Sequence, residues 1–216
     1  MRKLLLASCV GLVCASAHAQ GFSVGVQGGT LGAGLLAEAT INRHFDARLG
    51  VNALSYSYNT NSGGVAYSGH LKLQTFEVLG DWHPWASSSF RLTAGALVNN
   101  NKFDLTGQSS GGAYTFNGVT YTAAQAGSVS AQVTFNQAAP YVGIGWGGDN
   151  GSAGLHFSSD IGVAYQGSPR ARITATGAAS NAALASNVAA AQSKLQSDLS
   201  SFRYYPVVEL GLTYRF

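Results

Sequence analysis

The sequence predicts an all-β protein, an eight-stranded antiparallel transmembrane β-barrel with an extracellular helix in its last long loop. Hydrophobic residues alternate with small or polar ones along eight segments, and successive side chains of a strand point to opposite faces of its sheet. The polar face carries Gly, Arg, Glu and Asp, which suits the narrow interior of a small barrel. Most segments also reach the roughly 9–11 residues that cross a membrane at a tilt.

The overall composition excludes several other classes of protein. A disordered chain is rich in charge and poor in aromatic residues, whereas this chain is 10% charged and 11% aromatic. Beyond the N-terminus, no stretch approaches the roughly 20 apolar residues that a spanning helix needs. The formal charge of +3 is small and scattered, so we expect no nucleic-acid surface.

Residues 1–19 have the pattern of a secretory signal peptide. A basic start at 1–3 precedes an apolar run at 4–13 and a small-x-small cleavage site at 17–19. Both cysteines, Cys9 and Cys14, lie within this segment. The mature chain, 20–216, would therefore have no disulfide and no cysteine-based metal site or nucleophile.

The eight expected strands are defined by their alternation and by the turns between them. They span 21–29, 33–41, 46–58, 70–83, 90–106, 136–148, 154–166 and 203–216. Alternation alone fits either a soluble sandwich or a membrane barrel. A solvated face usually carries many Lys and Glu, which this chain lacks, and the apolar face is very apolar, so the pattern favours the barrel. The fourth strand is irregular, because Leu71 and Leu73 share parity with Glu77 and Asp81. Either a bulge near Gln74 or emergence of the strand from the membrane would explain this.

The lengths of the connections predict which side of the membrane each faces. Turns at 42–45, 84–89 and 149–153 are short, whereas 107–135 and 167–202 are long. With an even number of strands, the short turns lie on the periplasmic side with both termini and the long loops lie outside. All three tryptophans fall at the expected periplasmic rim, where amphipathic rings favour the headgroup level. They are Trp82, Trp85 and Trp146.

The C-terminal octet, 209–216, resembles the terminal signal of outer-membrane barrels. Its matching positions are Glu209, Gly211, Tyr214 and Phe216. The resemblance implies recognition by the barrel-assembly machinery, with outer-membrane lipid and lipopolysaccharide as surroundings. More broadly, the chain resembles small OmpA/OmpX-type outer-membrane proteins. It also resembles a poorly characterised proteobacterial outer-membrane family, through the segments Asn99–Leu105 and Gln166–Pro169.

The inward parity gathers charged residues into an expected lumenal charge network. The candidates are Glu38, Arg48, Glu77, Asp81, Arg91, His156, Asp160, Glu209 and Arg215. Charges enclosed in a narrow barrel must pair, because an unpaired buried ion costs several kcal/mol. The network is either a packed polar core or a gated ion path. An eight-stranded barrel encloses side chains rather than water, which favours the core.

His156, Ser158 and Glu209 form the only candidate catalytic group. Their spacing resembles the His-x-Ser plus Glu arrangement of the outer-membrane lipid A deacylase, in which His activates Ser. That family's His-x-Ser-Asn context is missing, since Ser159 follows Ser158. The parity of the pair is also lumenal, whereas a lipid substrate would require it to face outward. We therefore expect no enzyme.

The two long loops contain local structure of their own. An amphipathic stripe predicts a helix within 178–202, which either packs on the other loops as a lid or docks a partner or a second copy. The candidate docking residues are Leu184, Val188, Leu195, Leu199 and Phe202. In the other loop, Asn117-Gly118 predicts a hairpin over 114–121 that extends the fifth and sixth strands.

The sequence indicates no cofactor and no metal, because it contains no phosphate-binding loop and its histidines do not cluster at zinc-ligand spacing. The expected function is that of a non-enzymatic outer-membrane barrel with a structural, surface-interaction or adhesion role. The alternatives are a narrow conduit for ions or small solutes and, more weakly, a lipid-modifying enzyme.

Overall fold

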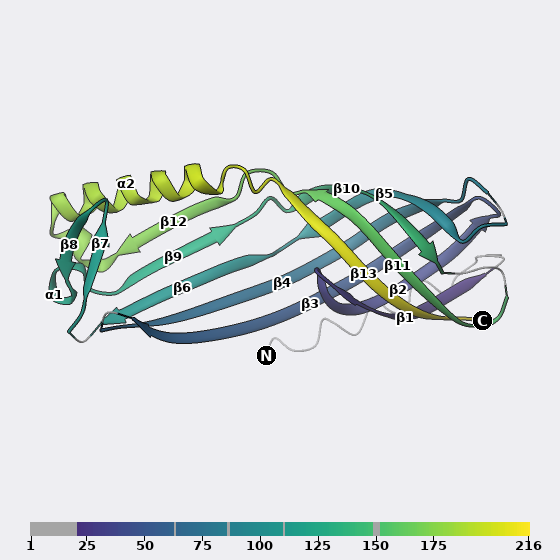
Figure 1. Ribbon diagram of the computed structural model, residues 1–216, viewed down its shortest axis with the longest axis horizontal. Helices are drawn as coiled ribbons and strands as arrows, with labels where there is room; N and C mark the ends of the chain where they lie inside the picture. The colour runs from purple at the N-terminus through teal and green to yellow at the C-terminus, as the bar shows by residue number, and fades with distance from the viewer. Residues whose placement is uncertain (1–20, 63, 86, 110, 149–151) are drawn as a thin grey trace, which may run out of the picture.

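The computed structural model describes residues 21–62, 64–85, 87–109, 111–148 and 152–216. These residues form a strongly curled antiparallel sheet of eleven strands and a separate two-stranded hairpin (Figure 1). Within these ranges, no helix has the length and apolar character to cross a membrane. The expected signal peptide, 1–19, lies outside the described residues.

Eight strands pair with one another in a closed circuit. They are β1 (Phe22–Gly29), β2 (Gly32–Asn42), β3 (Phe45–Ser62), β4 (Val65–Trp82), β5 (Phe90–Asn99), β10 (Ala138–Gly147), β11 (Gly154–Tyr165) and β13 (Tyr204–Arg215). Consecutive members of this set pair antiparallel, and β13 pairs with β1. The set matches the eight expected segments, although β3 and β4 extend well beyond their expected bounds.

The expectation of one strand over 90–106 is wrong, because the strand is interrupted at Asn100 and Asn101. The Asn100 backbone N donates to the Gln74 carbonyl oxygen at 2.9 Å, and the Gln74 backbone N donates to Asn101 Oδ1 at 2.7 Å. The Asn101 side-chain oxygen thus takes the place of a backbone carbonyl as the acceptor for Gln74. One part of β4 therefore pairs with β5 and the other with β6 (Lys102–Ser109).

Beyond this break, the sheet continues outward on one side only. The ends of β3 and β4 are joined by β6, β9 (Val129–Thr134) and β12 (Arg170–Ala175), in the order β12-β9-β6-β4-β3. We call this part the distal sheet. It contains the residues expected at the roots of the two long loops, and it lies at the end of the molecule opposite the C-terminus (Figure 1).

Strand β4 has no bulge near Gln74, so the first of the two explanations for its irregular alternation is wrong. β3 and β4 pair residue by residue, from Phe45 opposite Trp82 to Ser62 opposite Val65. What changes along β4 is the polarity of its two faces. The outer face passes from Trp82, Val78 and Phe76 to Lys72, His70 and Ser68. The inner face changes in the opposite sense, from Asp81 and Glu77 to Leu73, Leu71 and Val65.

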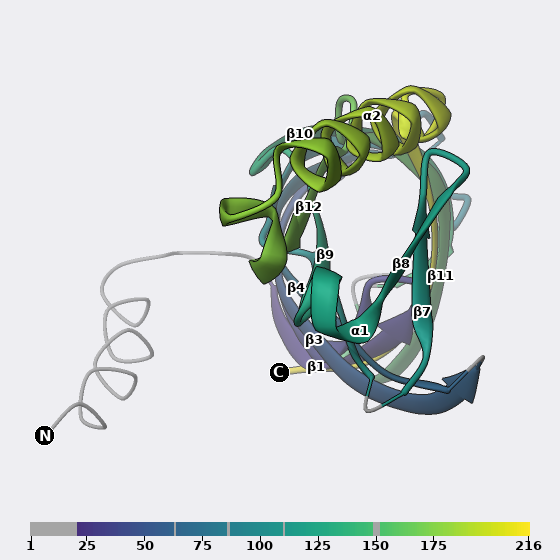
Figure 2. The same cartoon turned by 90° about the vertical axis from the view of Figure 1, so that its left-hand side faces the viewer.

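A cap covers the distal sheet. It consists of the hairpin β7 (Ala113–Phe116) and β8 (Val119–Thr122), the short helix α1 (Ala123–Ala126), the 3-10 helix η2 (Thr176–Ala179) and the helix α2 (Ala182–Leu199). Figure 2 shows α2 and the hairpin on different sides of the distal end. Their shared core contains Val65, Tyr114, Phe116, Tyr121, Ala126, Ala175, Leu184 and Val188.

The structure confirms the hairpin but not its expected attachment. Asn117 and Gly118 have φ values of 50° and 80°, the left-handed conformation that a tight hairpin turn requires. The hairpin forms its own two-stranded sheet instead of extending neighbouring strands. The helix is shorter than the expected 178–202, because Asn181 Oδ1 accepts from the Leu184 backbone N at 3.1 Å and caps its start.

Candidate functional site

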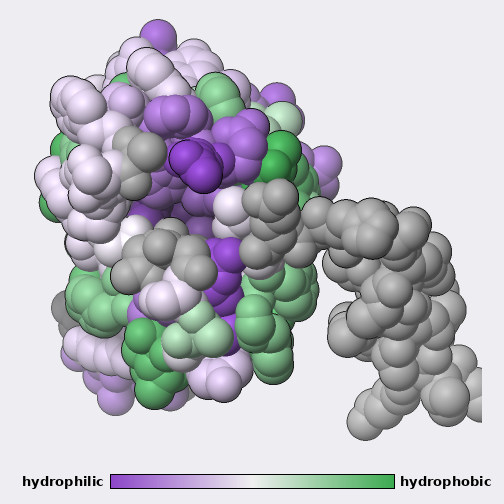
Figure 3. Space-filling view, turned by 90° about the vertical axis from the view of Figure 1, so that its right-hand side faces the viewer, coloured by the Kyte–Doolittle hydropathy of each residue, from purple (hydrophilic) through white to green (hydrophobic). Residues whose placement is uncertain are grey.

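The outer faces of the eight circuit strands carry an apolar belt. Along β13, Leu210, Leu212 and Tyr214 are exposed while Glu209, Thr213 and Arg215 are buried. This confirms the expected orientation, in which large apolar side chains point away from a polar interior. Other members of the belt are Val24, Val26, Leu35, Leu49, Val51, Phe76, Val78, Val142, Leu155, Phe157, Ile161 and Val208. Figure 3 shows strongly hydrophilic residues at the centre of the end near the C-terminus, with hydrophobic residues gathered mainly below them in this view.

Aromatic residues gather at the end of the belt nearest the C-terminus. Trp82 ends β4, and Phe90 packs against both Trp85 and Trp146, with ring centroids 5.9 and 5.5 Å apart. All three tryptophans therefore lie at one rim.

Inside the circuit, two arginines and two aspartates form an ion network. Arg48 Nη1 donates to Asp160 Oδ2 at 2.9 Å, and Arg48 Nη2 donates to Asp160 Oδ1 and to Asp81 Oδ1, both at 3.1 Å. Arg91 Nη2 donates to Asp160 Oδ2 at 2.7 Å, and Arg91 Nε lies 3.6 Å from Asp81 Oδ1. The four residues are 1–5% exposed. Their formal charges cancel, which is the condition for holding ions in a confined interior.

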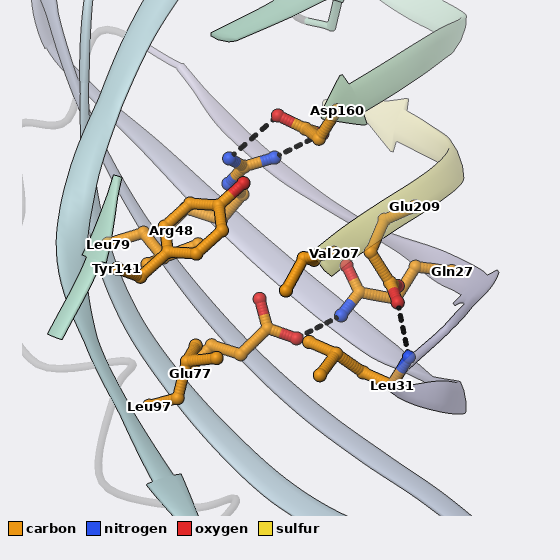
Figure 4. A pocket seen from close by; sticks show the side chains of 10 residues that line it. All are labelled: Gln27, Leu31, Arg48, Glu77, Leu79, Leu97, Tyr141, Asp160, Val207 and Glu209. Atoms are coloured by element: carbon orange, nitrogen blue, oxygen red, sulfur yellow. Dashed lines mark hydrogen bonds and ion pairs between the residues drawn. The ribbon is translucent and has the colours of Figure 1, made fainter. Parts of the chain in front are cut away.

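The buried glutamates are held mainly by amide groups. Gln27 Nε2 donates to Glu77 Oε1 at 2.8 Å, and Asn52 Nδ2 donates to the same oxygen. Glu209 Oε1 accepts from the Leu31 backbone N at 3.1 Å (Figure 4). Gln27 and Asn52 are members of this interior that were not predicted from the sequence, although both share the inward parity of the charged residues.

The remaining candidates differ in their relation to the ion network. Glu38 is buried opposite Arg48 on the neighbouring strand. Arg215 lies at the C-terminal end, where its Nη1 donates to Thr40 Oγ1 at 3.5 Å. His156 is only partly buried, and its Nε2 lies 2.8 Å from the Ser152 carbonyl oxygen. Its assignment to the charge network is therefore wrong, because its ring is turned toward the adjoining loop.

An apolar layer crosses the interior next to the ion network. It consists of Leu31, Leu79, Leu97, Ala139, Tyr141, Ala164 and Val207. Leu31 belongs to the turn between β1 and β2, and it is almost fully buried within this layer. Thr30 fixes the turn, since Tyr205 Oη donates to its carbonyl oxygen at 2.5 Å.

Two cavities flank this layer, each with a volume of about 10 Å³. One borders Arg48, Glu77 and Asp160 (Figure 4), and the other borders Asn99, Asn101 and Gln166. Leu31 and Leu97 contact both cavities. Each has room for about one water molecule. Within the described ranges, no group of His, Cys, Asp and Glu is arranged to hold a metal ion.

The candidate catalytic group does not assemble. Among the described residues, no hydrogen bond joins His156 to Ser158, and the Glu209 carboxylate contacts Leu31 rather than a histidine. Ser158 is buried beside Gly211, where an added Cβ would lie 2.5 Å from Ser158 Oγ. The terminal motif thus places Glu209 and Gly211 inward, whereas Tyr214 and Phe216 are exposed with ring centroids 5.2 Å apart.

Most of the candidate docking residues pack within the cap and are not free to bind a partner. Leu184 and Val188 are buried, and Leu195 and Leu199 are half-buried. Phe202 lies beyond the end of α2 and is exposed, so it does not continue the stripe.

The polar side of α2 also covers the free edge of β12. Gln192 Oε1 accepts from the Ile173 backbone N at 3.0 Å, and Gln196 Oε1 accepts from the Ala171 backbone N at 2.9 Å. These bonds satisfy strand donors that would otherwise form an open sheet edge.

Two solved structures from Acinetobacter baumannii share this fold. CarO2 aligns with a TM-score of 0.59 and 18% identity, over 91% of this chain and 98% of that protein. CarO aligns with a TM-score of 0.57 and 20% identity, over 90% and 97%. No family model and no curated protein matches the chain. At these identities the likeness concerns the fold, and the function has to be argued from the chain's own residues.

Proposed function

We propose that this chain is a non-enzymatic outer-membrane β-barrel of a Gram-negative bacterium, which holds a rigid extracellular cap for structural or surface interactions. The observation that carries the proposal is the apolar belt around a polar, ion-paired interior. Water outside such a sheet would leave the belt unburied, whereas acyl chains bury it. The resemblance to OmpA/OmpX-type proteins stays a prediction.

The height of the belt fits a membrane. On β3 the outer face is apolar from Phe45 to Ala53 and then carries Ser55, Ser57 and Asn59. Nine residues at about 3.3 Å each, tilted by about 45°, span roughly 21 Å, close to the apolar band of about 25 Å in outer-membrane barrels. β4 changes polarity at the same level, since Ala53 pairs with Gln74. This agreement supports emergence of both strands from the membrane at one boundary.

The distal sheet would then stand in water outside the cell. Its outer face is polar, as in a soluble protein. Its inner face is apolar, and the cap covers the part that includes Val65, Ile173 and Ala175, whereas Leu54, Tyr56 and Tyr58 of β3 remain exposed. The cap buries the apolar stripe of α2, which favours a lid over a docking helix. The surface offered to a partner would therefore be the polar exterior of the cap.

Site-specific labelling in intact cells tests the proposed orientation. The cysteines Cys9 and Cys14 fall within the expected signal peptide, so introduced thiols would be the ones available in the mature chain. An impermeant maleimide should label Ser57→Cys in intact cells. It should label Arg43→Cys, in the turn between β2 and β3, only after the outer membrane is opened. Labelling of both variants in intact cells would refute the proposed topology.

Surface interaction is tested by removing α2. Cells that produce the chain without residues 182–199 should attach to surfaces less than cells with the full chain, at equal amounts of labelled protein in the outer membrane. Equal attachment would exclude α2 as the interacting part of the cap.

A narrow conduit is the second candidate function. The two cavities support it, because a movement of Leu31 and Leu97 would join them. The apolar layer between them opposes it, since water would have to enter a dry constriction. In planar bilayers, we expect no single-channel steps from the refolded protein. Reproducible steps that grow when Leu31 is changed to Ala would establish the conduit instead.

Lipid modification is tested by Ser158→Ala. Because His156 Nε2 contacts the Ser152 carbonyl oxygen, and no hydrogen bond joins His156 to Ser158 among the described residues, we expect unchanged lipid A acylation in cells that produce the variant. A difference in acyl pattern between cells with the original chain and cells with the variant would refute the non-enzymatic proposal.

A further inference from the structure

The outer face of the distal sheet carries a row of cations just beyond the apolar belt. Lys72 lies opposite Lys102, Lys102 opposite Thr134, and Thr134 opposite Arg170, so one row crosses β4, β6, β9 and β12. Arg172 lies one step further along the same face of β12. Lys72, Arg170 and Arg172 are exposed, and the Lys102 side chain is 44% exposed. We call Lys72, Lys102, Arg170 and Arg172 the basic patch.

Little of the positive charge of the basic patch is neutralised by carboxylates of the described residues. Asp104 pairs with one member of the patch, with Oδ2 lying 3.4 Å from Lys102 Nζ and Oδ1 accepting from Gln132 Nε2 at 2.6 Å. Among the described residues, Lys72, Arg170 and Arg172 make no ion pair. Like charges directly opposite one another on neighbouring strands are destabilising. An external anion would remove this penalty.

The concentration of charge is unusual for this chain. The mature segment 20–216 contains ten Lys and Arg residues. Three of these, Arg48, Arg91 and Arg215, are buried inside the circuit. Four of the remaining seven belong to the basic patch, although the mature segment has a formal charge of only +1. The patch is therefore a local feature and does not follow from a generally basic surface.

The level of the patch fits the headgroup layer of the membrane. Lys72 lies four residues beyond Phe76, the last apolar residue on the outer face of β4. At about 3.3 Å per residue and a tilt of about 45°, this is roughly 9 Å above the apolar belt. Headgroups extend roughly 5–8 Å beyond the hydrocarbon on each side, and lysine side chains reach several ångströms toward an interface.

We infer that the basic patch binds phosphate groups of a lipid headgroup in the outer leaflet. Lys72 and Lys102 would act as two point charges on one phosphate, and Arg170 and Arg172 would offer planar donor pairs to a second. A lipid that carries two phosphates fits this spread of charge better than a zwitterionic lipid does. The inference rests on the proposed membrane placement, because only that placement brings the patch to headgroup level.

The test compares lipid binding by three forms of the purified full chain in nonionic detergent. They are the original chain, Lys72→Gln with Lys102→Gln, and Lys194→Gln as a control for an exposed lysine on α2. The probes are lipid A with two phosphates, phosphatidylcholine, and inorganic phosphate at the same phosphate concentration. Binding is measured by titration calorimetry, and circular dichroism checks that each form keeps its strands.

The original chain and Lys194→Gln should bind lipid A with equal affinity and should not bind phosphatidylcholine. The double variant should bind lipid A about thirtyfold more weakly, since each surface cation contributes roughly a factor of five at an anionic membrane. Equal affinity of the double variant and the original chain would overturn the inference. Equal binding of inorganic phosphate would overturn the lipid as the source of the phosphate.

This outcome is separable from that of the proposed function. If labelling at Ser57 and Arg43 fails the expected pattern, the membrane placement is wrong. If labelling follows the pattern and the affinity for lipid A is unchanged in the Lys72→Gln, Lys102→Gln variant, only the lipid site is refuted.

Discussion

Replacing Arg48 with Met should strongly destabilise the protein. The substitution keeps a long side chain but removes three hydrogen bonds to Asp160 and Asp81. Asp160 then keeps its contact with Arg91 at 2.7 Å, whereas Asp81 keeps Thr93 and a longer approach to Arg91. Breaking a buried ion pair by removing one partner costs about 3–5 kcal/mol.

Equilibrium unfolding in urea measures this loss. The refolded chain in detergent micelles or lipid vesicles is followed by tryptophan fluorescence, and the midpoint shift is converted to free energy with the denaturant slope. Arg43→Met serves as the matched control, because Arg43 is exposed in a turn and its loss should stay within about 0.5 kcal/mol.

A double variant separates pairing from packing. Arg48→Met with Asp160→Asn removes one charge of each sign, so it should recover part of the loss, with a coupling of roughly 0.5–3 kcal/mol. If Arg48→Met matches the control, the interior does not depend on paired charge. The ion network would then be a consequence of the fold and not a cause of its stability.

Three further changes should affect the cap and not the belt. Gln192→Ala with Gln196→Ala should speed amide hydrogen exchange in β12, and unchanged exchange would show that α2 does not protect that edge. Leu184→Ala should cost the cap about 2–5 kcal/mol, seen as faster proteolysis within 167–202 while heat-resistant mobility of the barrel on gels persists. Gly118→Ala should cost about 1 kcal/mol because its φ of 80° disfavours a Cβ, and an unchanged melting profile of the cap would contradict this.

The parity of the strands could be read from the sequence because a period of two needs only local information. The same pattern also exposed the irregular fourth strand, and one of its two explanations is excluded by the continuous pairing of β3 with β4. The inner leucines of β4 could not be interpreted locally. Leu71 and Leu73 lie on the inner face of β4 at the level of the distal sheet, beyond the ion network. Leu79 belongs to the apolar layer between the cavities.

Other features depended on contacts between distant parts of the chain. The turn at Leu31 reads as a simple connection, yet it fills the interior because Glu209 and Tyr205 hold it there. The break at Asn100 and Asn101 is decided by Gln74 on another strand. Gln27 and Asn52 had the right parity, but their contact with Glu77 could not be predicted from it. Gln27 lies on β1, which does not pair with β4, so its hydrogen bond to Glu77 depends on the closure of the whole circuit.

The first and last strands of the circuit lie side by side, with Ser23 opposite Arg215 and Gly29 opposite Glu209. Their pairing joins the most distant parts of the described chain, so it imposes the largest loop-closure entropy of any contact in the fold. Until the final dozen residues are in place, β1 therefore presents an unpaired strand edge. A chain shortened by β13 would keep two open strand edges, on β1 and β11, and would be prone to aggregation.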